Sequence, residues 1–256
     1  MQKVQFVNNR GEKLAGIFCR TEKEKAPCVI ICHGLGSSKD NKEPLMKAFS
    51  ENGLASMAFD FSGHGESQGS FEKLTVTNAV ADSKAAIDYA SSLASVDASR
   101  IGIMGHSFGG SVSLIGAAGD KRIKSIVVSA PVTDFLETLK MLSDFDTKIG
   151  NLAVWKDKGY THYLNAGQKY MKLEYPFFED AMKFDMKKIA TKIKSPVLFI
   201  QGNKDRVSPI SQSKKMFDIL SCEKDMKILE CGHYFEEQDL ENLIELSQNW
   251  FIKWLG

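Results

Sequence analysis

Short apolar runs and longer amphipathic runs alternate along most of the chain. The apolar runs PCVIICHG (27–34), RIGIMG (100–105) and IKSIVVSAP (123–131) are nearly continuous and rich in β-branched residues. Such runs are typical of strands that are buried on both faces. The runs at 43–53 and 74–94 instead carry apolar residues at helical spacing. Strands that alternate with helices in this way predict a parallel sheet with helices on both faces.

The same reading extends over most of the remaining chain. VQFV (4–7) and LAGIFC (14–19) predict an opening hairpin. Further strands are predicted at 54–60, 195–202 and 225–230, and further helices at 111–119, 208–220 and 240–255. Residues 132–190 break this rhythm, because they show many aromatic residues and no clean strand. We therefore expect a core formed by residues 1–131 and 191–256, and a small lid or cap insertion at 132–190.

Composition narrows the classes of partner and the compartment. The 33 Lys and Arg residues nearly balance the 32 Asp and Glu residues, which gives no electrostatic reason to expect nucleic acid or an anionic membrane as a partner. The first residues lack the apolar core of a signal peptide, and no stretch is apolar enough to span a bilayer. The five cysteines are odd in number and lack C-x-x-C spacing. Free thiols in a reducing cytoplasm explain them, and a metal site is not expected.

Two segments match G-x-S-x-G, the pattern around the nucleophile of many serine hydrolases. GHSFG (105–109) follows a predicted buried strand and precedes a helix of mostly small residues. A serine on a strained strand-to-helix turn needs small neighbours, which Gly105 and Gly109 supply. GESQG (65–69) lies in a Gly-rich loop that no helix follows. We therefore predict Ser107 as the nucleophile and treat Ser67 as a loop residue.

With Ser107 in this place, the chain resembles the α/β-hydrolase superfamily over essentially its whole length. That family orders its triad as serine, acid and histidine, and the resemblance implies Asp205 in QGNKDRVSP and His233 in ECGHYF. Both follow predicted strands, and loops at the carboxyl ends of parallel strands converge on one crevice. Asp134 in APVTDF is the alternative acid, because some relatives carry the acid one strand earlier.

Two further loops carry the resemblance. HGLG (33–36) resembles the oxyanion loop, which implies that the backbone N–H groups of Leu35 and Phe108 form an oxyanion hole. DFSGHGES (60–67) resembles the Gly-rich loop that follows the next strand, so GESQG belongs to a loop that shapes the site floor. We expect His33 and His64 to be structural, hydrogen-bonding residues of these loops.

The aromatic residues of the insertion have two alternative roles. Trp155, Tyr160, His162 and Tyr163 are candidate substrate contacts in a lid over the crevice. Alternatively, such residues form the small core of the lid itself, and the sequence does not assign them individually.

The resemblance implies a cytoplasmic serine hydrolase that cleaves a small-molecule carboxylic ester through an acyl-enzyme, without a cofactor. The chain looks most like the small carboxylesterases that include feruloyl and cinnamoyl esterases. A monoacylglycerol lipase or an acylaminoacyl-type peptidase would use the same residues. A binding protein without catalysis is a third alternative, against which the complete set of three triad residues argues. No nucleic acid or membrane partner is expected; the oligomeric state is left open, with a homodimer as one alternative.

Overall fold

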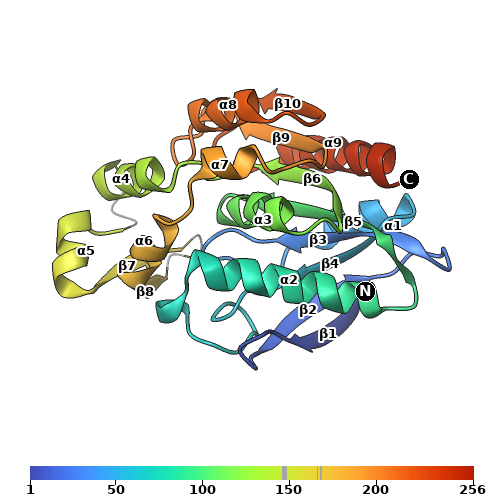
Figure 1. Cartoon of the computed structure of the whole chain (residues 1–256), viewed down its shortest axis with the longest axis horizontal. Helices are drawn as coiled ribbons and strands as arrows, with labels where there is room; N and C mark the ends of the chain where they lie inside the picture. Colours follow the sequence, from blue (N-terminus) through green and yellow to red (C-terminus); the bar gives the residue numbers. More distant parts are fainter. Residues whose placement is uncertain (146–148, 166, 168) are drawn as a thin grey trace.

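A computed structural model describes residues 1–145, 149–165, 167 and 169–256, and it contains a mixed sheet of eight strands (Figure 1). The strand order is β1-β2-β4-β3-β5-β6-β9-β10, and β2 runs antiparallel to both of its neighbours while the other pairs are parallel. The strands are β1 (Gln2–Val7), β2 (Lys13–Cys19), β3 (Ala26–Cys32), β4 (Ala55–Phe59), β5 (Val96–His106), β6 (Ile123–Ser129), β9 (Val197–Gly202) and β10 (Lys224–Leu229). The mostly parallel sheet confirms the predicted α/β fold class.

Helices cover both faces of this sheet (Figure 1). One face packs against α2 (Val76–Ser92), α3 (Phe108–Gly119) and α8 (Ile210–Ile219), and the other against α1 (Glu43–Glu51) and α9 (Glu237–Leu255). Every residue of β3 is buried. Its side chains alternate between the two faces, so that Ile30 belongs to the core on the α2 and α3 side and Ile31 to the core on the α1 and α9 side. This explains the continuous apolar run in the sequence.

Four parallel strands bring the candidate loops to one edge of the sheet. β3 ends just before HGLG, β5 ends just before Ser107, β9 ends three residues before Asp205, and β10 ends shortly before His233. Because parallel strands share their direction, their carboxyl ends lie at the same edge. A short 3₁₀ helix, η1 (Phe71–Lys73), closes the Gly-rich loop before α2 begins.

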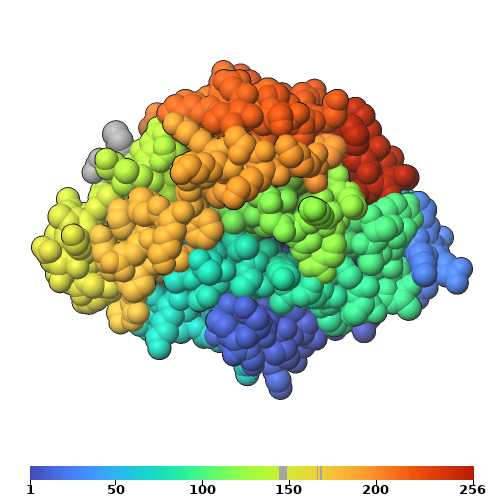
Figure 2. Space-filling view, in the orientation of Figure 1, coloured from blue at the N-terminus to red at the C-terminus, as the bar shows by residue number. Residues whose placement is uncertain are grey.

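In the segment 132–190, which we call the lid segment, the described residues up to 181 lie at one end of the molecule, whereas residues 186–190 pack on α3 and α8 of the core (Figures 1 and 2). It contains α4 (Phe135–Phe145), α5 (Leu152–Lys158), β7 (Tyr160–Leu164), β8 (Tyr170–Glu174), α6 (Pro176–Ala181) and α7 (Met186–Ala190). The prediction that this segment contains no strand is wrong, because β7 and β8 form an antiparallel hairpin apart from the main sheet. A hairpin of two five-residue strands exposes one face, so polar residues interrupt its apolar pattern.

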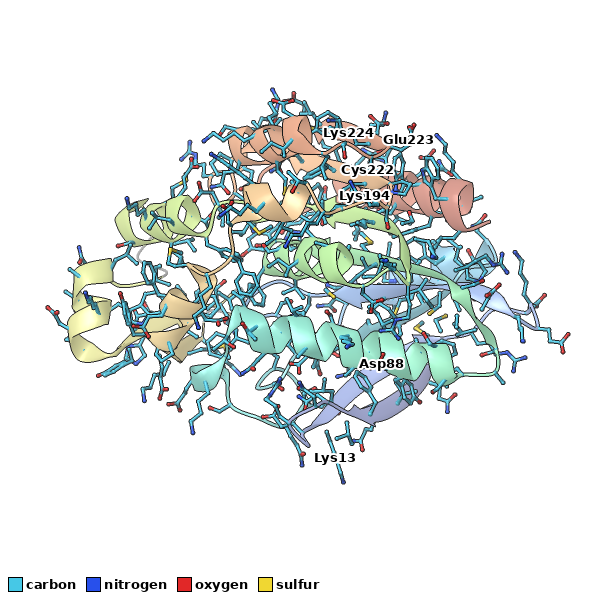
Figure 3. The ribbon with its side chains drawn as sticks, viewed as in Figure 1. Lys13, Asp88, Lys194, Cys222, Glu223 and Lys224 are labelled. Carbon is cyan, nitrogen blue, oxygen red and sulfur yellow. The ribbon has the colours of Figure 1, made fainter. Side chains whose placement is uncertain are left out.

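The cysteines are free, and the lysines of 183–194 lie on the surface. Cys19, Cys28, Cys32, Cys222 and Cys231 are all free. Cys222, which Figure 3 labels together with Lys194, Glu223 and Lys224, lies where β9 and β10 begin, at the opposite end of these strands from Asp205 and His233. The lysines of 183–194 are exposed. Within the described ranges no group of His, Cys, Asp and Glu could hold a metal ion, and no helix is long and apolar enough to cross a membrane.

Candidate active site

Ser107 occupies a strained turn between β5 and α3. Its backbone torsions are φ 53° and ψ −118°, a region that a serine adopts only under tertiary constraint. A Cβ atom built on Gly105 would run into the backbone of Gly109, and one built on Gly109 would run into the carbonyl groups of Cys32 and His33. The two glycines of GHSFG therefore allow the turn to pack against itself and against the end of β3, as the motif predicts.

Ser107, His233 and Asp205 form a continuous hydrogen-bonded chain. The Oγ of Ser107 lies 2.9 Å from Nε2 of His233, and Nδ1 of the same ring lies 2.9 Å from Oδ2 of Asp205. Because a carboxylate only accepts, the Nδ1 atom of His233 carries the proton and donates it to Asp205. The Nε2 atom is then an acceptor for the Ser107 hydroxyl. This is the tautomer that a general base for Ser107 requires.

Three more donors fix the Asp205 carboxylate. Its Oδ1 accepts from the backbone N–H groups of Val207 (2.8 Å) and Ser208 (2.9 Å), and its Oδ2 accepts from Nε2 of Gln201 (3.0 Å). Sequence reasoning missed Gln201, which is fully buried. The available signal was a polar residue within the otherwise apolar run of β9.

The alternative acid, Asp134, has other hydrogen-bond partners than His233. Its Oδ1 accepts from the backbone N–H of Glu137 at the start of α4, and its own N–H donates to Oε1 of Gln212. The structure thus pairs His233 with Asp205, and Asp134 has the geometry of a helix cap.

The two predicted oxyanion donors belong to segments that lie next to Ser107. The HGLG loop passes beside the serine, since a Cβ built on Gly34 would lie 3.6 Å from Cβ of Ser107. Phe108 is the first residue of α3, where helix geometry leaves the N–H without an intrahelical acceptor. In the part of the chain that the structure describes, the Leu35 N–H has no hydrogen-bond acceptor either. Neither amide is therefore occupied by an acceptor from the described residues.

Buried histidines hold the HGLG loop (33–36), which we call the oxyanion loop after its predicted role. His33 and His64 are structural, hydrogen-bonding residues, as predicted. His33 accepts from the Phe61 N–H through Nε2 (3.1 Å) and donates from Nδ1 to the carbonyl of Gly34 (2.8 Å). His64 accepts from the Gly36 N–H through Nε2 (3.3 Å) and donates from Nδ1 to the carbonyl of Ser62 (3.1 Å). Burial lowers the pKa of His64 to about 4 and that of His33 well below its usual range. Both rings are neutral near pH 7, as their acceptor roles require.

His106, which precedes the nucleophile, is also a neutral ring. Its centroid lies 5.0 Å from that of His233, and its Nδ1 lies 3.2 Å from the hydroxyl of Ser129. Burial, reinforced by nearby His233 and Lys42, lowers the pKa of His106 well below its usual range. His106 therefore adds little repulsion when His233 gains a proton.

Three of the four candidate lid residues lie in β7, on its two faces, and the fourth, Trp155, lies in α5. Tyr160 and His162 lie on the exposed face of β7, where their rings contact each other and Lys172 lies over the Tyr160 ring. Tyr163 lies on the buried face and donates its hydroxyl to the carbonyl of Leu35 at 3.2 Å. Trp155 is 1% exposed and donates from Nε1 to the Leu173 carbonyl within the lid segment. Of the four, only Tyr163 is brought to the oxyanion loop by a contact that the described structure shows.

Ser67 has a different set of partners. Its Oγ donates to the carbonyl of Asp60 (2.7 Å) and accepts from the N–H of Ala15 (2.9 Å). The bond to Asp60 closes the Gly-rich loop on itself, and the bond from Ala15 holds the loop against β2. The second G-x-S-x-G match is thus a structural loop, as its sequence context predicts.

Comparison with known proteins agrees with the fold. The family model described as "Serine aminopeptidase, S33" matches residues 23–157, which is more than half of the chain. An uncharacterised 31.7 kDa protein of Escherichia coli is 27% identical over 90% of this chain and 92% of its own length. The quorum-quenching protein AidA of Acinetobacter baumannii is 28% identical, with coverages of 80% and 79%. Est1E of Butyrivibrio proteoclasticus, solved with ferulic acid bound, superposes with a TM-score of 0.81 at 23% identity over 98% of this chain and 99% of that one.

Proposed function

Since the chain belongs to the serine aminopeptidase S33 family of α/β-hydrolases, we propose that it is a serine carboxylesterase with Ser107 as its nucleophile. The observation that carries this proposal is the relay from Ser107 through His233 to Asp205, with 2.9 Å at both steps. The relay begins at a serine in a strained turn and ends at a carboxylate fixed by three further donors. A serine activated in this way attacks acyl carbon atoms.

In the first half of the proposed reaction, Nε2 of His233 takes the proton of the Ser107 hydroxyl as its oxygen bonds to the ester carbonyl carbon. The carbonyl oxygen becomes an oxyanion, to which the N–H groups of Leu35 and Phe108 donate. Asp205 stabilises the imidazolium through the Nδ1–H bond and keeps its own charge. His233 then gives its proton to the alcohol oxygen as the carbon–oxygen bond breaks, leaving an ester between the acyl group and Ser107.

In the second half, a water molecule takes the place of the alcohol. His233 removes its proton while the water oxygen bonds to the acyl carbon, and the same two amides stabilise the second oxyanion. Collapse of this intermediate breaks the bond to Ser107, and His233 returns the proton to the serine oxygen. The products are the carboxylic acid and the free enzyme.

For the substrate, we propose a small ester with an aromatic or short acyl group. Two observations support this class: the motifs resemble those of the feruloyl and cinnamoyl esterases, and Est1E, which holds ferulic acid, has the same fold. The segment that would cover the acyl group is rich in aromatic residues, among them Trp155, Tyr175, Phe177 and Phe178, which pack on one another. Lipase and peptidase activities with the same residues are the alternatives.

The test compares the purified protein with Ser107→Ala and Ser67→Ala. We expect the wild type to hydrolyse p-nitrophenyl acetate, p-nitrophenyl butyrate and methyl ferulate, with weaker activity on p-nitrophenyl laurate. Ser107→Ala should fall to the background rate, whereas Ser67→Ala should keep its activity and lose stability, because two hydrogen bonds of its loop disappear.

Each other outcome would correct a different part of the proposal. Full activity of Ser107→Ala would show that Ser107 is not the nucleophile. Faster hydrolysis of laurate or of a monoacylglycerol than of ferulate would make the protein a lipase, and cleavage of acylaminoacyl amides would make it a peptidase. A wild type inactive on every ester and amide would favour a binding protein.

A further inference from the structure

The peptide groups around Leu35 are held by three side chains and one backbone N–H group. The carbonyl of Gly34, which shares a peptide plane with the Leu35 N–H, accepts from Nδ1 of His33 and from the N–H of Ser37. In the next peptide group, the Gly36 N–H donates to His64 at 3.3 Å, and the Leu35 carbonyl accepts from the Tyr163 hydroxyl at 3.2 Å. The contacts of His33 and Ser37 are local, and the contact of His64 comes from the Gly-rich loop. The contact of Tyr163 comes from the lid segment.

Tyr163 is itself held firmly at this position. It is 8% exposed and lies in β7, where it pairs with Met171 of β8. Its ring centroid lies 6.3 Å from that of Phe71, which belongs to η1 after the Gly-rich loop. Burial raises the pKa of the Tyr163 hydroxyl, so the group keeps the proton that it donates to Leu35.

The oxyanion loop leaves no room between itself and this ring. Gly36 has a φ of +66°, and a Cβ built on it would lie 2.7 Å from Cε1 of Tyr163. The backbone at Gly36 therefore rests on the tyrosine ring, while the adjacent carbonyl of Leu35 receives the tyrosine hydroxyl. The Leu35 carbonyl and the Leu35 N–H lie in the two peptide planes that meet at the Cα of Leu35. Holding the carbonyl therefore limits the rotations by which the plane of the N–H could turn against it.

We propose that Tyr163 is a positioning residue, supplied by the lid segment, that aims the Leu35 N–H at the oxyanion. This inference rests on the proposed function, because it assigns Leu35 to the oxyanion hole. The Tyr163 hydroxyl contacts the loop and not the reacting atoms, so it acts through the orientation of one amide. Donors of an oxyanion hole act on the transition state only when they point to where the charge develops.

The test removes the hydroxyl of Tyr163 and keeps its ring. Tyr163→Phe is compared with Tyr170→Phe, which makes the same change in the same hairpin at a side chain that is 67% exposed. For a p-nitrophenyl ester we expect kcat of Tyr163→Phe to fall about 5- to 10-fold, which is the weight of one hydrogen bond, with KM within about twofold. Tyr170→Phe should match the wild type.

Two readouts separate positioning of the amide from mere support of the fold. The first is the rate ratio between an ester and its thionoester, whose sulfur accepts hydrogen bonds weakly; Tyr163→Phe should lower this ratio because only the ester loses a strong oxyanion contact. The second is hydrogen exchange of residues 33–39, followed by mass spectrometry, which should become faster in Tyr163→Phe. A general loss of structure would slow both substrates equally and lower the unfolding temperature.

The outcomes distinguish this inference from the proposed function. If the wild type cleaves esters, then an unchanged kcat in Tyr163→Phe, or an equal loss on ester and thionoester, overturns the positioning role. If the wild type cleaves none, the proposed function fails, and exchange alone decides whether Tyr163 holds the loop. Faster hydrogen exchange of residues 33–39 in Tyr163→Phe would support the claim that Tyr163 holds this loop, and unchanged exchange would reject it.

Discussion

Replacing one oxygen of Asp205 by an amide nitrogen should reverse the tautomer of His233. In Asp205→Asn the side chain must place its oxygen and its NH₂ group in the two carboxylate positions. The Oδ1 position faces two backbone donors, the N–H groups of Val207 and Ser208 at 2.8 and 2.9 Å. The amide oxygen therefore takes that position, and the NH₂ group points to Nδ1 of His233 and to Gln201.

The reversed tautomer removes the general base. When Nδ1 of His233 accepts from the new amide, Nε2 must carry the proton, and it can no longer accept the proton of Ser107. We expect kcat for a p-nitrophenyl ester to fall by about 10⁴-fold, the loss typical of this change in a serine triad, with KM almost unchanged. The new amide also faces the NH₂ group of Gln201, whose other contacts, to Ser208 and Ser213, prevent it from turning over. This should cost about 1–3 kcal/mol of unfolding free energy.

Asp134→Asn provides the matched control. Asp134 caps α4 by accepting from the Glu137 N–H, and asparagine caps helices as well as aspartate does. Activity and stability should therefore remain close to those of the wild type. The reasoning would be refuted if Asp205→Asn kept more than a tenth of the wild-type kcat while still folded, or if Asp134→Asn lost activity to the same extent. Urea unfolding followed by circular dichroism shows whether each variant is folded.

Two further changes test the loop that carries the oxyanion donor. Because burial lowers the pKa of His64 from 6.5 to about 4, the unfolded chain binds more protons between these values. Neutral His64 therefore contributes roughly 3 kcal/mol to the unfolding free energy above pH 6.5, and this contribution is lost as the pH falls to 4. In His64→Gln, the urea midpoint should depend less on pH over this range. In Gly36→Ala the new methyl group suffers both an unfavourable φ of +66° and a clash with the Tyr163 ring. In Gly159→Ala it suffers only an unfavourable φ of +76°, because no atom of the described residues lies near it. By calorimetry Gly36→Ala should cost about 1–3 kcal/mol more than Gly159→Ala, and equal losses would show that the loop has room to move.

Much of the core and the turn at Ser107 could be predicted because local patterns specify them, whereas Asp205 and His233 were implied by the resemblance to the family. Strands buried on both faces have continuous apolar runs, and the turn at Ser107 needs glycines at 105 and 109 whatever surrounds it. Element boundaries were less accurate. The helix predicted at 111–119 begins at Phe108, because Gly109 and Gly110 serve close packing against β3 and Pro131 and do not interrupt the helix.

The parts that could not be predicted depend on contacts between distant segments. Tyr163 and Leu35 are 128 residues apart in the sequence, and their hydrogen bond exists only because the lid segment folds back on the core. The role of Gln201 likewise follows from the position of Asp205 in three dimensions. The hairpin β7–β8 was missed because a strand with one exposed face carries residues such as His162 and Lys172 in its pattern.

Because side chains alternate along a strand, β7 of this hairpin has one exposed face and one face that contacts the core. Tyr160 and His162 point outward from β7, and Tyr163 points inward to the oxyanion loop. Changes on the outward face can alter what the lid segment presents to solvent or to a substrate without disturbing Leu35. A shift of β7 by one residue would exchange the two faces and remove the hydroxyl from the loop. If Tyr163 positions the oxyanion donor, the register of β7 against β8 is therefore a condition for catalysis as well as for folding.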